Sequence, residues 1–346
     1  MLFLAFEICY YSVRRQIVGT KRRTAMIFEK QIVNMFRKQM YTRCDDNGTA
    51  YYFSAEDFEG LNKRSFKFTA QAGHTLQGYF YWYENPMENR LVVFEHGMGG
   101  GHRSYMREIE TIAKKGYMVF AYDHTGCMES GGENTNGFAQ SLKDLDCCIS
   151  TLKTIGGFKG SEITVIGHSW GGFSTQNIAA LHPDLKNVVA LSGFSSVKRM
   201  VAQHFGGVLK PYAKAVYALE ESSNPEYVKY DAVETLAKTD VKALIIHSGD
   251  DPLVKREFHF DIMHSALKDN KNVEFMLLSG KAHSPNYTYD AVKYKDEFFA
   301  TLTEKQKKKQ LETDGQKAEF VAGYDWWAMT VQDVDVWNKI FEFIEK

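Results

Sequence analysis

Residues 162–180, EITVIGHSWGGFSTQNIAA, join a short apolar run rich in β-branched residues to a serine between glycines and a helix-forming segment. This order predicts a strand, a sharp turn at Ser169 and a helix. Side chains two positions either side of a serine on so tight a turn would collide, and Gly167 and Gly171 remove them. The helix would direct its free N–H groups and positive dipole end at the serine. The pattern fits a raised nucleophile, and an incidental serine in a glycine-rich turn is the alternative.

Length and composition limit what can surround this serine. The chain has 346 residues, 44% of them hydrophobic and 14% aromatic, which is enough for a large core. Length alone suggests about two domains of ~150 residues, but one α/β domain with insertions is preferred. The net charge of −1 gives no field that would attract nucleic acid, so a neutral substrate is favoured. The five cysteines are odd in number and have no metal-ligand spacing, which indicates reduced thiols in a cytoplasmic protein.

Residues 1–50 are predicted to form an amphipathic helical extension before a main domain of residues 51–346. Residues 1–13 are apolar but include an acid, lack a cleavage site and are too short to span a bilayer, so neither a signal peptide nor a membrane helix is predicted. Apolar residues then recur at helical spacing among basic ones: Phe28, Ile32, Met35, Phe36 and Met40. Packing of this helix on the protein is favoured over contact with a membrane surface, because ordinary surface helices show the same stripe. Homo-oligomerisation is left open.

The main domain alternates predicted strands and helices. A hairpin and five buried strands are expected at residues 65–70 with 75–83, and at 90–95, 117–122, 187–191, 241–247 and 273–278. With the strand before Ser169, this alternation predicts a mostly parallel, twisted sheet with helices on both faces. It lapses at about 195–240, where Gly and Pro breakers predict a small helical cap, and again in a second insertion at about 284–325.

The pentapeptide Gly-His-Ser-Trp-Gly at 167–171, in its strand-turn-helix context, resembles the nucleophile elbow of the α/β-hydrolase family. Three further motifs stand in that family's order: a His-Gly loop at 96–100, an acid after 241–247 and a histidine after 273–278. The resemblance covers about residues 65–346. It is strongest to the branch of esterases, monoglyceride lipases and serine aminopeptidases, and it implies the α/β-hydrolase fold and chemistry without metal or cofactor.

The resemblance also implies a Ser-His-Asp triad. Ser169 would be the nucleophile, and His283 would take its proton and return it to the leaving group. Asp250 and Asp251 both follow the strand that should carry the acid. The family's pattern, laid on His247, favours Asp251, which would then orient the imidazole.

Other polar residues near the motifs receive different roles. By the resemblance, the backbone N–H groups of Met98 and Trp170 would form the oxyanion hole. His96 is out of order for a catalytic base, so a structural role is favoured, with contact to substrate as an alternative. Asp123 begins a D-x-x-G-x-x-x-S-G turn and is expected to organise a loop. Asp144, on a predicted helix before the elbow, is assigned to a solvated face.

Carboxylic esters with apolar or aromatic acyl groups are the expected substrates, cleaved through an acyl-Ser169 intermediate. Candidate pocket residues besides His96 are Phe194, Phe205 and Tyr212, although simple packing explains each of them as well. One alternative is a peptide or amide hydrolase of the aminopeptidase type, in which Glu220 and Glu221 of the cap would hold a free amine. The other is a non-catalytic relative that acts as a binding protein.

Overall fold

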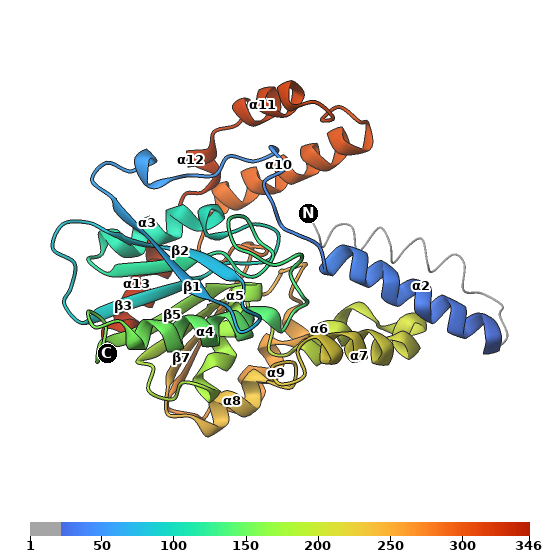
Figure 1. Cartoon of the computed structure of the whole chain (residues 1–346), viewed down its shortest axis with the longest axis horizontal. Helices are drawn as coiled ribbons and strands as arrows, with labels where there is room; N and C mark the ends of the chain where they lie inside the picture. The colour runs from blue at the N-terminus through green and yellow to red at the C-terminus, as the bar shows by residue number, and fades with distance from the viewer. Residues whose placement is uncertain (1–21) are drawn as a thin grey trace.

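The computed structural model describes residues 22–346, so the apolar segment 1–13 and Cys9 lie outside the described residues. Within this range the fold is built on one sheet, with strands in the order β1-β2-β4-β3-β5-β6-β7-β8 (Figure 1). The strands are β1 (Asn62–Thr69), β2 (Thr75–Trp82), β3 (Arg90–Glu95), β4 (Met118–Tyr122), β5 (Glu162–His168), β6 (Asn187–Leu191), β7 (Lys242–Ser248) and β8 (Val273–Leu278). The hairpin of β1 and β2 pairs antiparallel with β4, and all other neighbours are parallel. The predicted α/β-hydrolase fold class is confirmed.

Helices cover both faces of the sheet. In β3, Leu91 and Val93 belong to a core cluster shared with α4, whereas Val92 and Phe94 belong to a second cluster shared with α3 and α13. Successive side chains of a strand point to opposite faces, so these two clusters lie on opposite sides of the sheet. The helices are α2 (Arg22–Met40), α3 (Met106–Lys114), α4 (Gln140–Thr154), α5 (Trp170–Asn177), α6 (Val197–His204), α7 (Ala213–Ser223), α8 (Ala232–Lys238), α9 (Phe260–Leu267), α10 (Tyr289–Lys307), α11 (Asp314–Ala322), α12 (Trp326–Met329) and α13 (Val334–Ile344).

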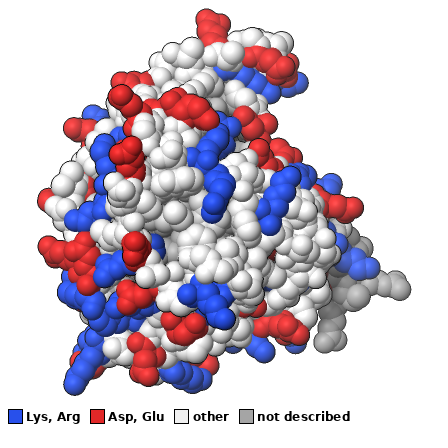
Figure 2. All heavy atoms as spheres, turned by 60° about the vertical axis from the view of Figure 1, so that its left-hand side comes forward, with Lys and Arg blue, Asp and Glu red and all other residues white. Residues whose placement is uncertain are grey.

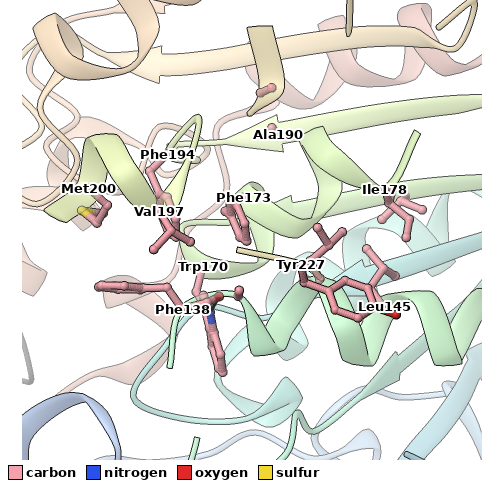
Figure 3. Close-up of a cluster of buried hydrophobic side chains, with 14 of the residues drawn as sticks. Phe138, Leu145, Trp170, Phe173, Ile178, Ala190, Phe194, Val197, Met200 and Tyr227 are labelled. Atoms are coloured by element: carbon pink, nitrogen blue, oxygen red, sulfur yellow. Dashed lines mark hydrogen bonds between the residues drawn. The ribbon is translucent and has the colours of Figure 1, made fainter. Parts of the chain in front are cut away.

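Aromatic stacking anchors α5 beneath the helices that follow β6 (Figure 3). The rings of Phe173 and Phe194 are stacked, with centroids 4.7 Å apart and planes at 4°. Phe138 meets Phe194 edge-on at 5.4 Å. Burial of each such ring stabilises the fold by roughly 2–3 kcal/mol. The start of α5, directly after Ser169, is therefore held by a closely packed core.

The segment between β6 and β7 carries α6, α7 and α8, and α2 packs on its α6–α7 part, called the cap here. Ile32, Phe36 and Met40 of α2 are buried in the same core cluster as α4. The Phe36 ring lies 6.1 Å from Phe138 and 6.3 Å from Phe205. The apolar stripe of this helix is thus buried against the protein. None of the helices in residues 22–346 is both long and apolar enough to cross a membrane.

The chain between β8 and α13 forms a small unit of its own. Its helices α10, α11 and α12 project from the sheet at the top of Figure 1. They share an apolar cluster made of Phe298, Leu302, Leu311, Phe320 and Met329. The Lys281 ammonium ties the start of this unit to α13, because it donates to the Asp333 carboxylate (2.6 Å) and to the Tyr287 carbonyl oxygen (2.5 Å). This attachment lies two residues before His283.

Candidate active site

The turn after β5 holds Ser169 in a conformation that other positions of the chain rarely adopt. Ser169 has φ 56° and ψ −111°, and α5 begins at the next residue. A Cβ at Gly167 would collide with the Gly171 carbonyl oxygen, and a Cβ at Gly171 would collide with the Glu95 carbonyl oxygen. Both glycines are therefore required for the approach of α5 to the sheet, and the strained backbone at Ser169 persists because its neighbours are tightly packed.

His283 and Asp251 meet beyond the carboxyl ends of β8 and β7. The His283 Nδ1 atom lies 2.7 Å from Asp251 Oδ2, and the N–H groups of Leu253 and Val254 donate to Oδ1 at 2.9 Å each. Asp251 is only 5% exposed. Burial by itself would raise the pKa of Asp251, but the charge and hydrogen bond of His283 outweigh it, so this pKa is lowered. An ionised carboxylate only accepts, so Nδ1 carries the proton and Nε2 is left as an acceptor.

The other candidate acid, Asp250, is exposed and turned away from His283. Its carboxylate accepts hydrogen bonds from the Ser248 hydroxyl (2.5 Å), the Gly280 N–H (2.8 Å) and the Ala282 N–H (3.2 Å). It therefore holds the backbone of the loop that carries the histidine. Of the two aspartates, the structure brings Asp251 to the imidazole.

The serine and histidine loops are joined through His168, the residue before Ser169. Its ring centroid lies 4.7 Å from that of His283, and its Nε2 lies 2.6 Å from the His283 carbonyl oxygen. Its Nδ1 lies 2.9 Å from the Tyr105 hydroxyl oxygen. Ser169 is 7% exposed and thus lies just below the surface of this junction.

The two proposed oxyanion donors come from different elements. Met98 lies in the loop that follows β3, and Trp170 is the first residue of α5, where N–H groups have no partner within the helix. The Trp170 indole N–H donates to the Phe138 carbonyl oxygen at 2.6 Å, which fixes this residue from behind. The helix dipole adds positive potential at the same place.

His96 lies beneath the oxyanion loop. It is 0% exposed, its Nδ1–H donates to the Gly97 carbonyl oxygen (2.7 Å), and its Nε2 accepts from the His124 N–H (2.9 Å). Burial lowers the pKa of His96 to about 3, and the charge on His124 adds to this effect. His96 is therefore neutral at pH 7 and supports the backbone, with no surface that a substrate could contact.

A buried charged cluster lies next to this support. His124 has its Nε2 3.3 Å from Glu95 Oε2 and its Nδ1 3.6 Å from Asp144 Oδ2. Burial opposes the charge of His124, but the two carboxylates outweigh it and raise its pKa to about 9. Within residues 22–346, no three His, Cys, Asp or Glu side chains are grouped so that they could hold a metal ion. The cluster thus forms a charged support beneath Trp170, whose ring centroid lies 4.9 Å from that of His124.

The assignment of Asp144 to a solvated face was wrong. Asp144 is buried, and its carboxylate accepts from the Thr125 N–H (2.7 Å) and hydroxyl (2.8 Å). The loop after β4 covers this face of α4, and helical periodicity gives no sign of a covering loop. The role of Asp123 is confirmed, because its carboxylate accepts from the N–H and the Nδ1–H of His102, at 2.8 and 2.7 Å.

The three aromatic pocket candidates are all packed into the core. Phe194, Phe205 and Tyr212 belong to the cluster that contains α4 and the cap. Phe194 stacks on Phe173 of α5, and Phe205 meets Phe36 of α2. Packing accounts for these contacts, and it places Phe194 closest to the helix that starts at the serine.

Glu220, a candidate amine ligand, is a buried anchor between the cap and α4. It is 0% exposed, and its Oε2 accepts from the Phe138 N–H at 2.8 Å. Burial raises the pKa of Glu220 to about 8, although the Phe138 N–H partly offsets the effect. Its carboxyl group faces the backbone and not open space. Glu221, by contrast, is exposed.

This raised pKa makes stability depend on pH. In an unfolded chain the pKa of Glu220 returns to about 4.3. Between about pH 4 and 8 the unfolded chain loses this proton while the folded chain keeps it, so the contribution of Glu220 to the unfolding free energy falls as pH rises. Glu220→Gln keeps an oxygen acceptor for the Phe138 N–H and removes the titration. We expect wild type to lose roughly 3 kcal/mol more than this variant between pH 5 and pH 8.

Urea unfolding of both proteins at pH 5 and pH 8 measures this difference. Glu221→Gln is the matched control, because the exposed neighbour should leave the pH slope as in wild type. Equal slopes for wild type and Glu220→Gln would show that the Glu220 carboxyl titrates at its ordinary pKa.

Comparisons with known proteins show what the chain as a whole is similar to. Residues 87–229 match the family model for "Serine aminopeptidase, S33". The proline iminopeptidase of Saccharolobus solfataricus is 28% identical over 165 residues, which are 45% of this chain and 51% of that protein. The monoglyceride lipase homolog of Monkeypox virus is 28% identical over 113 residues, 32% of this chain and 40% of that protein. The chain spans about half or less of the length of these curated relatives.

Among solved structures, an esterase of Pyrococcus furiosus has a TM-score of 0.56 at 21% identity, over 78% of this chain and 98% of that chain. At this level of identity the likeness is one of fold. It extends over nearly all of the esterase and leaves part of this chain without a counterpart there.

Proposed function

We propose that this chain, which has the α/β-hydrolase fold and is similar to S33 peptidases and monoglyceride lipases, cleaves carboxylic esters through an acyl-Ser169 intermediate. The observation that carries the proposal is the 2.7 Å contact of His283 Nδ1 with Asp251, on a loop that is bonded to the residue before Ser169. A serine in a strained turn at the start of a helix supplies the nucleophile.

In the proposed reaction, Asp251 holds the proton on His283 Nδ1, so that Nε2 accepts the Ser169 hydroxyl proton as Oγ attacks the ester carbonyl carbon. The N–H groups of Met98 and Trp170 stabilise the oxyanion, each by about 3 kcal/mol. The C–O bond to the alcohol then breaks, and His283 gives its proton to the departing oxygen. Water attacks the acyl-Ser169 ester by the same route, which releases the acid and restores the serine.

The burial of Glu220 favours an uncharged ester over a peptide with a free amine. Glu220 is fully buried and already bonded to the backbone, so the carboxylate that a peptide amine would need at this position is not open to it. The face drawn in Figure 2 carries acidic and basic residues interspersed around a largely uncharged area, in keeping with the net charge of −1. An ester with an apolar or aromatic acyl group is therefore the substrate that we propose.

The test is intact-mass analysis after treatment with a fluorophosphonate, with peptide mapping, beside a matched substrate panel. The panel contains p-nitrophenyl esters and monoacylglycerols of increasing chain length, and the p-nitroanilides of proline and alanine with free amines. We expect one adduct, on Ser169, and at least about 100-fold higher kcat/KM for the best ester, a transition-state difference of roughly 2.7 kcal/mol. Preference for the aminoacyl anilides would favour the aminopeptidase alternative, and the absence of an adduct would favour a non-catalytic binding protein.

A further inference from the structure

We propose that His168 and Tyr105 form a positioning relay, which sets the loop of His283 and the oxyanion loop in register with Ser169. The inference rests on the proposed hydrolase function and adds to it two residues that are neither triad members nor oxyanion donors. Neither side chain is assigned a bond to substrate, so both are positioning residues.

The relay is continuous from one loop to the next. Tyr105 ends the short 3₁₀ helix His102–Tyr105, and its hydroxyl lies 2.9 Å from His168 Nδ1. The Gly97 backbone packs against the same hydroxyl so closely that a Cβ there would collide with it. On the other side, His168 Nε2 lies 2.6 Å from the His283 carbonyl oxygen. One histidine therefore links the loop of Met98, the elbow and the loop of the catalytic imidazole.

Only one arrangement of protons satisfies these contacts. The His283 carbonyl can only accept, so His168 Nε2 carries a hydrogen, and Nδ1 must accept from the Tyr105 hydroxyl in the neutral ring. Burial, and after it the charge of His283, hold the pKa of His168 well below its usual range. The other charged groups that face it are Lys295, which also disfavours a charge on the ring, and Asp251, which favours one weakly. The relay thus keeps one tautomer throughout the pH range of the reaction.

The relay holds His283, the residue whose distance from Ser169 matters most for the rate. The contacts of Asp250 and Lys281 hold the loop at positions 280 to 282, whereas His168 holds the carbonyl of His283 itself. A displacement of this residue by about 1 Å would change the distance from its Nε2 to the serine, and errors of that size can cost about 100-fold in rate. A partly buried carbonyl without its donor also costs free energy, about 1 kcal/mol, so the loop would shift to find another partner.

Two amide substitutions of His168 test the roles of its two ring nitrogens separately. In His168→Gln, the amide nitrogen reaches the position of Nε2 and can still donate to the His283 carbonyl. In His168→Asn, the amide reaches only the position of Nδ1, so the bond to Tyr105 is kept and the bond to His283 is lost. We expect kcat to fall about 30- to 100-fold in the Asn variant and at most about fivefold in the Gln variant, with KM within about twofold in both. The kcat of Tyr105→Phe should lie between the values of these two variants.

The measurement is kcat per fluorophosphonate-labelled serine, with kcat/KM followed from pH 5.5 to 9. Counting labelled sites separates a positioning effect from loss of folded protein, since misfolded molecules would lower the labelled fraction but not kcat per site. His182→Asn is the matched control: like His168 it is 8% exposed, and it bonds through both nitrogens, to Asp146 and Lys153, away from the site. Its kcat per site should equal that of wild type.

Equal kcat per site in the Asn and Gln variants of His168 would overturn the relay, and so would a wild-type value in the Asn variant. A wild-type protein that takes no label at Ser169 would overturn the hydrolase function itself, before any variant is compared. The two failures are therefore distinguishable in one experiment.

Discussion

Replacement of Ser169 by alanine is expected to lower kcat for ester hydrolysis by about 10⁶-fold, to the level set by binding and the oxyanion hole alone. The hydroxyl oxygen is the atom that would become acylated, and no neighbouring side chain can take its place on the turn. The fold should survive, because the Ser169 side chain makes no capping hydrogen bond to α5. Steady-state kinetics, fluorophosphonate labelling and a thermal unfolding scan measure the three parts of this expectation.

Ser192 offers a matched control. It too has a positive φ, 48°, directly after a parallel strand, and its hydroxyl is buried without a hydrogen-bond partner. Ser192→Ala should keep both turnover and labelling. Residual turnover above about 1% in Ser169→Ala, with purified protein, would show that another group is the nucleophile.

Asp251→Asn is expected to cost about 10⁴-fold in kcat, against less than about tenfold for Asp250→Asn. The Leu253 and Val254 N–H groups both donate to Asp251 Oδ1 and would retain the amide oxygen of an asparagine there. The amide NH₂ would then face His283 Nδ1, which would have to accept, and the proton would move to Nε2. An imidazole in that tautomer cannot take the proton of Ser169.

The neighbouring Asp250→Asn variant serves as the control, because Asp250 bonds only Ser248 and the loop backbone in this structure. Both variants are compared by kcat per correctly folded molecule, with circular dichroism as the check on folding. A larger loss for Asp250→Asn than for Asp251→Asn would reverse the assignment of the acid.

The sheet was predictable because its central strands are buried on both faces. The run at 90–95 has no polar interruption, and β3 spans Arg90–Glu95 as predicted. The predicted helix that carries Asp144 is α4, and it begins only at Gln140, because Phe138 before it bonds to Glu220 and Trp170 from distant parts of the chain. The four motifs led to the correct fold and to the group of proteins that the chain is similar to.

The residues that sequence reasoning missed interact over long separations in the chain. Tyr105 lies 63 residues from His168, and His168 lies 115 residues from His283, so no local pattern records their contacts. Asp144 failed for a related reason, since its partner Thr125 lies on another element. Glu220 stood out only as an acid in an apolar cap, and its burial could not be known before the packing of α7 on α4. Local sequence patterns identify the residues that can react. The residues that hold them in place can be identified only from the tertiary fold.

The packing of α2 on the cap affects how the cap could move. Ile32, Phe36 and Met40 are embedded in the same core as α6 and α7, although some 170 residues separate them along the chain. A cap held in this way cannot move as a rigid body without α2. Any displacement of the cap would have to move α2 with it. Binding of another molecule to α2 would therefore change how far the cap can move.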